Sequence, residues 1–301
     1  MAALRRAPAA TAGVRASQIR RRRLAAGVAA LVLVALLIGL LASSGGSTPA
    51  SSTAHAAAKR TAPARSAPPS DTEQDQRAAV ASVLGYTPFV KQGSGRARDV
   101  ALTFDDGPGP YTPELLSVLE REDVRATFFA IGRMERYFSA STVREIRDGD
   151  VVGDHTETHP MLALMSAHAQ HEELLEPIIR FEALGGPRAI LFRPPYGSFN
   201  ATTFHELKAL HLLMVLWSVD TKDYTLPGVH AIVQSALAGA HPGAIILMHD
   251  GGGDRSETIA ALPAIIRGLH ARHLHIVTIP QMMLAEPPPA GQPIPTSLAG
   301  D

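Results

Sequence analysis

The sequence contains no cysteine among its 301 residues, and its first 70 residues contain no aspartate or glutamate. The absence of cysteine excludes disulfides, thiolate metal sites and a cysteine nucleophile. The same first 70 residues hold ten of the 28 basic residues, which leaves 18 basic against 28 acidic residues from position 71 onward. This acidic remainder gives no reason to expect nucleic acid as a partner.

The N-terminal segment is basic and then strongly apolar. Residues 1–23 contain seven arginines, and residues 24–42 are 19 uncharged, mostly apolar residues. A membrane-spanning helix needs about 20 such residues, whereas the apolar part of a cleaved signal peptide has about 7–15. The sequence therefore predicts a transmembrane anchor at 24–42, with 1–23 in the cytoplasm and the rest of the chain outside the cell. Secretion after cleavage near Ala54–Ala56 is the alternative.

Residues 43–70 are predicted to be a tether. All but four of these 28 residues are Ala, Ser, Thr, Pro or Gly, which offer too little apolar surface to form a core. Ser70 and Glu73 have the spacing of a capping box, so we expect a helix over 71–84 that ends at Gly85, within a lead-in of residues 71–96. A proline-rich tail occupies 285–301, and no feature indicates an obligate protein partner.

From residue 97 to 284, short apolar runs alternate with amphipathic stretches, which indicates a parallel sheet covered by helices on both faces. Seven repeats suggest a barrel, although a doubly wound open sheet would show the same alternation. Helices are expected from Thr112, from Ala167 to Leu184 with a kink or break at Pro177, after Asn200 and after Ser256. The predicted strands are 100–104, 126–131, 150–155, 189–193, 213–219, 244–248 and 275–279.

The less common polar residues come directly after these predicted strands. In a parallel barrel such positions gather at one face, where active sites are built. We therefore expect the following residues to share one site: Asp105, Asp106, His155, His159, Arg193, Asp220, Asp223, His249 and Asp250.

His155 and His159 have the spacing at which two imidazoles can reach one metal ion, although this spacing alone often arises by chance. Two imidazoles and one carboxylate form a site for a divalent metal with open positions for water and substrate. Zinc is the first expectation, with iron, cobalt, nickel or manganese as alternatives. Of the adjacent Asp105 and Asp106, one can bind the metal while the other takes a proton from its water. An iron oxygenase uses a similar ligand set, but usually with a His-x-Asp spacing that this sequence lacks.

Five segments occur in the order typical of one enzyme family: TFDDGP (103–108), HTETH (155–159), RPPYG (193–197), SVDTKDY (218–224) and ILMH (246–249). In these motifs, residues 97–284 resemble the polysaccharide deacetylases, the NodB-homology domain of carbohydrate esterase family 4. The resemblance implies an α/β fold, a distorted (β/α)7 barrel of parallel strands. It also implies metal-dependent removal of acetyl groups from N-acetylglucosamine units of a polymer.

The resemblance assigns roles to the polar residues of the first motifs. Asp105 is expected to be the general base, and Arg193 to pair with it and hold it ionised and oriented. Asp106 is expected to bind the metal together with His155 and His159.

The later motifs supply the remaining roles. His249 is expected to protonate the departing amine, and Asp223 to orient it. The backbone N–H of Tyr196 would stabilise the oxyanion. Leu247 would contact the acetyl methyl group, and Pro195 and Tyr196 would lie against the substrate.

Two positions depart from the family pattern, since Tyr224 stands where tryptophan is more usual and Asp154 where asparagine is common. We interpret Trp217 as a core residue, and His270, His273 and His275 as surface residues. The expected substrate is a cell-wall glycan, with peptidoglycan favoured. Chitooligosaccharides or another surface glycan are alternatives, as is a non-catalytic wall-binding module.

Overall fold

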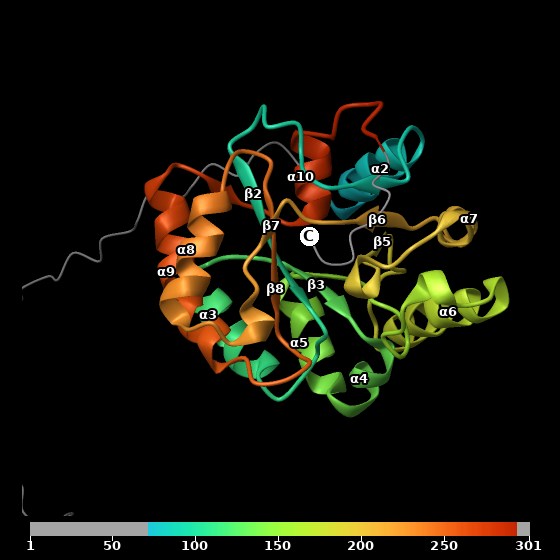
Figure 1. The fold of residues 1–301 in the computed structure, drawn as a ribbon, viewed down its shortest axis with the longest axis horizontal. Helices are drawn as coiled ribbons and strands as arrows, with labels where there is room; N and C mark the ends of the chain where they lie inside the picture. The colour runs from blue at the N-terminus through green and yellow to red at the C-terminus, as the bar shows by residue number, and fades with distance from the viewer. Residues whose placement is uncertain (1–71, 294–301) are drawn as a thin grey trace, which may run out of the picture. The chain divides into compact units, whose positions relative to one another are not determined.

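The computed structural model of the protein describes residues 72–293 and is built around a parallel β-sheet (Figure 1). The strands lie in the order β1-β6-β5-β4-β3-β2-β8-β7, and β9 pairs with β2. Their bounds are β1 (Phe89–Val90), β2 (Asp99–Asp105), β3 (Thr127–Ala130), β4 (Val151–Asp154), β5 (Leu191–Phe192), β6 (Leu213–Val215), β7 (Val219–Asp220), β8 (Ile245–His249) and β9 (His275–Ile276).

The predicted anchor at 24–42 and linker at 43–70 lie outside the described residues, as do residues 294–301 of the predicted tail. Among residues 72–293, no helix has the length and apolarity needed to cross a membrane. The boundaries predicted for the N-terminal segments therefore stay predictions.

Each of the seven predicted strands is present, and the predicted distorted barrel takes the form of a curled half-barrel of parallel strands. The described strands follow one another from β1 to β7, their direction turns from β8 to β6 (Figure 1), and β1 and β7 are not paired with each other among the described residues. The run predicted as one strand at 213–219 is two strands, because the chain crosses there from one edge of the sheet to the other. Leu216 N bonds to Val90 O at 2.7 Å, and Ser218 N bonds to Ile245 O at 3.1 Å. The short strand β1 was not predicted.

Helices cover both faces of the sheet (Figure 1). Of these, α4, α5, α8 and α10 were not predicted individually. The bounds are α2 (Glu73–Leu84), α3 (Thr112–Arg121), α4 (Gly132–Tyr137), α5 (Ser139–Asp148), α6 (Ala167–Ala183), α7 (Ala201–Leu210), α8 (Val229–Gly239), α9 (Ser256–Ala271) and α10 (Ile279–Ala285), with short 3-10 turns at Leu162–Leu164, Pro195–Gly197 and Asp223–Thr225.

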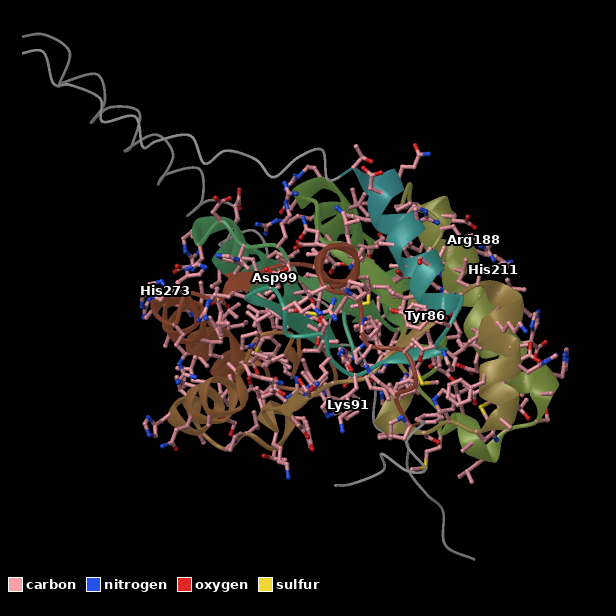
Figure 2. The ribbon with its side chains drawn as sticks, turned by 90° about the horizontal axis from the view of Figure 1, so that it is seen from above. Tyr86, Lys91, Asp99, Arg188, His211 and His273 are labelled. Carbon is pink, nitrogen blue, oxygen red and sulfur yellow. The ribbon has the colours of Figure 1, made fainter. Side chains whose placement is uncertain are left out.

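The first described helix begins later than predicted. Thr72 is its N-cap, because Thr72 Oγ1 accepts from Asp75 N at 3.2 Å and Asp75 Oδ2 accepts from Thr72 N at 3.3 Å. This capping box replaces the one predicted between Ser70 and Glu73. The helix ends at Gly85 as expected. Figure 2 shows α10 end-on with α2 beside it, and Tyr86 OH at the end of α2 donates to Pro288 O at 2.7 Å.

Helix α6 is not broken at Pro177 and continues from Ala167 to Ala183. A proline inside a helix leaves the carbonyl four residues earlier without its donor. Here that carbonyl, of Glu173, accepts a hydrogen bond from Glu157 N at 2.9 Å. Of the kink or break predicted from the sequence, the break is absent, because a distant segment supplies the donor that this carbonyl lacks.

Strand β2 shows how the sheet separates core from site. Val100, Leu102 and Phe104 pack into the cluster shared with α3, α8 and α9. Side chains alternate along a strand, so Ala101, Thr103 and Asp105 point to the other face. Ala101 joins the cluster with α2 and α10 at the start of the strand, and Asp105 reaches a cavity at its end. One seven-residue strand thus anchors two cores and delivers a carboxylate to the site.

Candidate active site

A cavity of about 710 Å³ lies at the carboxyl ends of the strands. It brings together side chains that the sequence separates by more than a hundred residues. Of the residues predicted for the site, those that line this cavity are Asp105, Asp106, His155, His159, Tyr196, Asp220, Leu247 and His249.

Arg193 lies beneath Asp105 and is completely buried. Its Nη1 donates to Asp105 Oδ1 at 2.7 Å and to Thr103 Oγ1 at 2.8 Å. Its Nε and Nη2 donate to backbone carbonyls of Val215 and Leu216, and its guanidinium carbon lies 4.1 Å from the centre of the Phe129 ring. The guanidinium is therefore fixed on all sides and holds one oxygen of Asp105 in place.

Asp106, His155 and His159 converge as predicted for a metal site. Asp106 Oδ1 lies 3.5 Å from His155 Nε2 and 3.1 Å from His159 Nε2, and it is buried without a hydrogen-bond partner. His155 Nδ1 lies 2.7 Å from the carbonyl oxygen of Arg193, which can only accept, so the proton sits on Nδ1 and Nε2 is free to bind a metal. These donors fit a divalent ion such as zinc.

The pKa of Asp106 is consistent with a role as a metal ligand. Burial alone would raise the pKa of the Asp106 carboxyl, but the imidazoles of His155 and His159 lower it below its usual range. Asp106 is consequently ionised and ready to bind a cation at neutral pH.

The backbone around Asp106 leaves no space for extra atoms. Asp106 has a left-handed φ of 70°, and Gly251 and Gly252 pack directly on it. A Cβ on Gly252 would lie 2.4 Å from Asp106 Oδ2, so a side chain there would displace the carboxylate. Sequence reasoning missed these glycines, although the run of three at 251–253, one residue after the ILMH motif, was an available signal.

His249 is held by Asp223 on the opposite wall. His249 Nδ1 donates to Asp223 Oδ1 at 2.8 Å, and His249 N donates to Asp223 Oδ2 at 2.9 Å. Thr258 Oγ1 adds a third bond to this carboxylate at 2.8 Å. Burial alone would lower the pKa of His249, but the bond to Asp223 raises it above the usual value. Alternation along β8 places Leu247 on the same side as His249, in the cavity wall.

Tyr196 has a left-handed φ of 58° and is 56% exposed. Its ring packs edge-on against His159, with centroids 4.5 Å apart. Pro195, which is predicted to lie against the substrate, is buried and is not among the residues that line the cavity, whereas its neighbour Pro194 is. The side chains of adjacent residues in a tight turn point in different directions, and the motif alone does not show which of them points into the cavity.

Trp217 also differs from expectation. It packs against the core cluster as predicted, but it lines the cavity as well. Sequence reasoning missed other lining residues too: Ile131, Arg133, Met161, Lys222 and Arg255. These lie in loops or at helix starts, where no periodicity marks the side that faces a cavity.

Asp154 and Tyr224, the two residues that depart from the family pattern, both make defined contacts near the site. Asp154 is buried, and its Oδ1 accepts from Thr156 N at 2.7 Å, which fixes the start of the HTETH loop. Tyr224 packs edge-on against His249, with ring centroids 5.2 Å apart.

Two other predictions concern residues outside the cavity lining. Asp250, which was predicted to belong to the site, accepts a hydrogen bond from Thr112 Oγ1 at 2.5 Å beneath the cavity and does not line it. The histidines 270, 273 and 275 are exposed as expected, and His273 lies at the periphery in Figure 2.

Comparison with known proteins gives the family. The family model described as polysaccharide deacetylase matches residues 92–215. The chitooligosaccharide deacetylase of Rhizobium leguminosarum bv. trifolii is 36% identical over 210 residues, which cover 66% of this chain and 97% of that protein. The chain belongs to the polysaccharide deacetylase family. Another relative in this deacetylase family is a peptidoglycan-N-acetylglucosamine deacetylase of Bacillus cereus, 37% identical over 61% of this chain and 87% of that protein.

Solved structures of the deacetylase family share the fold. A peptidoglycan N-acetylglucosamine deacetylase in complex with a benzamide ligand superposes with a TM-score of 0.64 at 32% identity, covering 67% of this chain and 95% of the other. A family 4 pseudoenzyme from Bacillus anthracis gives a TM-score of 0.62 at 28% identity, covering 65% and 69% of the two chains. Membership in the deacetylase family thus agrees with the fold and disfavours the iron oxygenase alternative.

Proposed function

We propose that the protein is a metal-dependent hydrolase that removes N-acetyl groups from N-acetylglucosamine-type residues of an extracellular polymer, with peptidoglycan as the substrate. The observation that carries the proposal is that three groups of side chains meet at one cavity. They are Asp105 hydrogen-bonded to Arg193, the candidate metal ligands Asp106, His155 and His159, and His249 hydrogen-bonded to Asp223. Peptidoglycan and chitooligosaccharide deacetylases among the relatives support the substrate class.

Asp106, His155 and His159 would hold the metal. Zinc is our first assignment, with cobalt, nickel, manganese or iron as alternatives, because nitrogen and carboxylate ligands suit all of these ions. When bound, the ion supplies Lewis acidity that polarises the amide carbonyl and lowers the pKa of water to about 7.

The residues around this site would carry the proton transfers. Asp105 takes a proton from the attacking water through its Oδ2, since Oδ1 is engaged by Arg193. The backbone N–H of Tyr196 donates to the oxyanion that develops from the carbonyl.

His249 would complete the reaction. Its Nδ1 is engaged by Asp223, so Nε2 delivers the proton to the departing amine nitrogen, and acetate and a free amine result. Leu247 offers an apolar wall for the acetyl methyl group.

Two alternatives remain for the activity. The Rhizobium relative favours a chitooligosaccharide or another surface glycan as substrate. The likeness to a pseudoenzyme favours a non-catalytic wall-binding module, although this chain retains the base, the acid and all three ligand residues.

We further propose that residues 24–42 anchor the protein in the cell membrane and that the catalytic domain acts outside the cell. The apolar stretch preceded by seven arginines supports this arrangement. Secretion after cleavage is the alternative, and the mass of the mature protein distinguishes the two.

Acetate release by the full-length chain tests the proposed activity. The purified protein is assayed on peptidoglycan and on chitin oligomers, first with a chelator and then with zinc restored. Release that the chelator abolishes and zinc restores supports the proposal, and the preferred glycan identifies the substrate. Asp105→Asn should abolish release, whereas His270→Ala, an exposed control, should retain it. Absence of release from both glycans by metal-loaded protein would refute the proposed activity.

A further inference from the structure

The segment that carries both candidate histidine ligands, residues 155–159, has a strained backbone. We call it the histidine loop. Thr156 has a φ of 68° and His159 a φ of 65°, in the left-handed region that residues with a side chain seldom adopt. Such conformations persist only where surrounding contacts hold them. Helices α4 and α6, which lie side by side in Figure 1, supply contacts of this kind.

Helix α6 binds the loop through a gap in its own hydrogen bonding. Pro177 has no N–H, so the helix leaves the carbonyl of Glu173 free, and Glu157 N donates to it at 2.9 Å. The Glu173 side chain continues the contact, since Oε2 accepts from Thr158 N at 2.8 Å and Oε1 accepts from Thr158 Oγ1 at 2.6 Å. Glu173 therefore engages two consecutive peptide N–H groups of the loop.

A second set of bonds closes around the same residues. Arg180, one turn beyond Pro177, donates from Nη1 and Nη2 to the two carboxylate oxygens of Glu157, at 2.5 and 3.1 Å. From α4, Gly132 N and Arg133 N donate to the carbonyls of Thr156 and Glu157 at 3.0 and 3.1 Å. The backbone of the loop is thus held from both sides.

We propose that Glu173, together with the proline-generated gap at Pro177, preorganises the histidine loop for metal binding, and that Glu173 is a positioning residue for His159. His159 directly follows Thr158, the residue that Glu173 holds, and with the loop in this conformation its Nε2 lies 3.1 Å from Asp106 Oδ1. Residues that orient metal ligands in this way typically contribute 10- to 100-fold to metal affinity. The inference rests on the proposed metal site.

Zinc titration of the chelator-stripped full-length chain tests the positioning role, with the melting temperature of the metal-free protein measured in parallel. Glu173→Ala should weaken zinc binding by about 10-fold or more. Glu173→Gln, whose amide oxygen can still accept from Thr158 N, should recover part of the affinity. Glu176→Ala is the matched control, because Glu176 lies on the exposed side of the same helix. Binding by Glu173→Ala within twofold of the wild type would overturn the inference.

Pro177→Ala separates positioning from simple stabilisation. Alanine restores a helical N–H that competes with Glu157 N for the Glu173 carbonyl, and it removes a residue unfavourable in helices. We expect weaker zinc binding with no loss of melting temperature in the metal-free protein. Wild-type affinity in Pro177→Ala would overturn the inference, as would affinities that simply follow the melting temperatures across all the variants. A wild-type chain that binds no zinc would instead refute the proposed metal site, and this inference with it.

Discussion

Replacing Arg193 with methionine should destabilise the protein by about 3–5 kcal/mol, the usual cost of leaving one partner of a buried ion pair uncompensated. The guanidinium is 0% exposed, and Asp105, although it lines the cavity, is only 3% exposed, so solvent replaces little of the lost interaction. The carbonyls of Val215 and Leu216 also lose a donor. Because the free energy of unfolding of such domains is roughly 5–15 kcal/mol, the variant should still fold but with a small remaining free energy of unfolding.

A double variant tests whether the loss comes from the interaction between Arg193 and Asp105. Asp105→Asn with Arg193→Met removes both charges, so its loss should be smaller than the sum of the single losses by about 1–3 kcal/mol. Urea unfolding followed by circular dichroism, at pH 7 with metal removed, measures these values. Arg188→Met is the control, because Arg188 pairs with Glu182 at the surface, where such pairs contribute about 0–1 kcal/mol. A loss below about 1 kcal/mol for Arg193→Met, or strict additivity in the double variant, would refute the reasoning.

Three further predictions concern pH and metal. Asp223 raises the pKa of His249, so Asp223→Asn should move the alkaline fall in kcat to lower pH; an unmoved pH profile would contradict the proposed role of His249 as the acid. Burial raises the pKa of Glu135 from 4.5 to about 8, so its stabilisation is present below pH 4.5 and is lost as pH rises toward 8. Glu135→Gln should therefore flatten the fall in unfolding free energy over this range, and denaturant titrations at several pH values test it. His159→Ala should lower the bound zinc per chain, measured by atomic absorption, whereas His270→Ala should not.

The strands were predictable because their signal is local. Each predicted run of five to seven residues contains a strand, and the place of Asp105 directly after the predicted strand 100–104 assigned it to the site before any packing was known. A kink or break was predicted at Pro177, and no break occurs there, because the Glu173 carbonyl finds its donor in Glu157, on another segment. Likewise, residues 213–219 are apolar apart from Ser218, and only their pairing with different strands reveals that the run divides into β6 and β7.

Within the site, the motif residues could be predicted because each follows a strand, and parallel strands bring such positions together. The remaining cavity wall depends on loops. Arg133 lies in the first turn of the short helix α4, and Lys222 has a left-handed φ of 54°, so neither belongs to a periodic pattern that would show which side faces the cavity. The contribution of Glu173 was also hidden, since a glutamate in an amphipathic helix ordinarily faces solvent.

The bonds of Arg193 also bear on the motions of the site. One side chain joins Asp105 at the end of β2 to the carbonyls of Val215 and Leu216 at the end of β6, across the inner side of the curled sheet. The floor of the cavity therefore cannot open locally, because any opening must break the hydrogen bonds of the buried guanidinium to Asp105, Val215 and Leu216 together. In native-state hydrogen exchange, the amides at these strand ends should exchange only through global unfolding, in contrast to those of the exposed loops around the cavity rim.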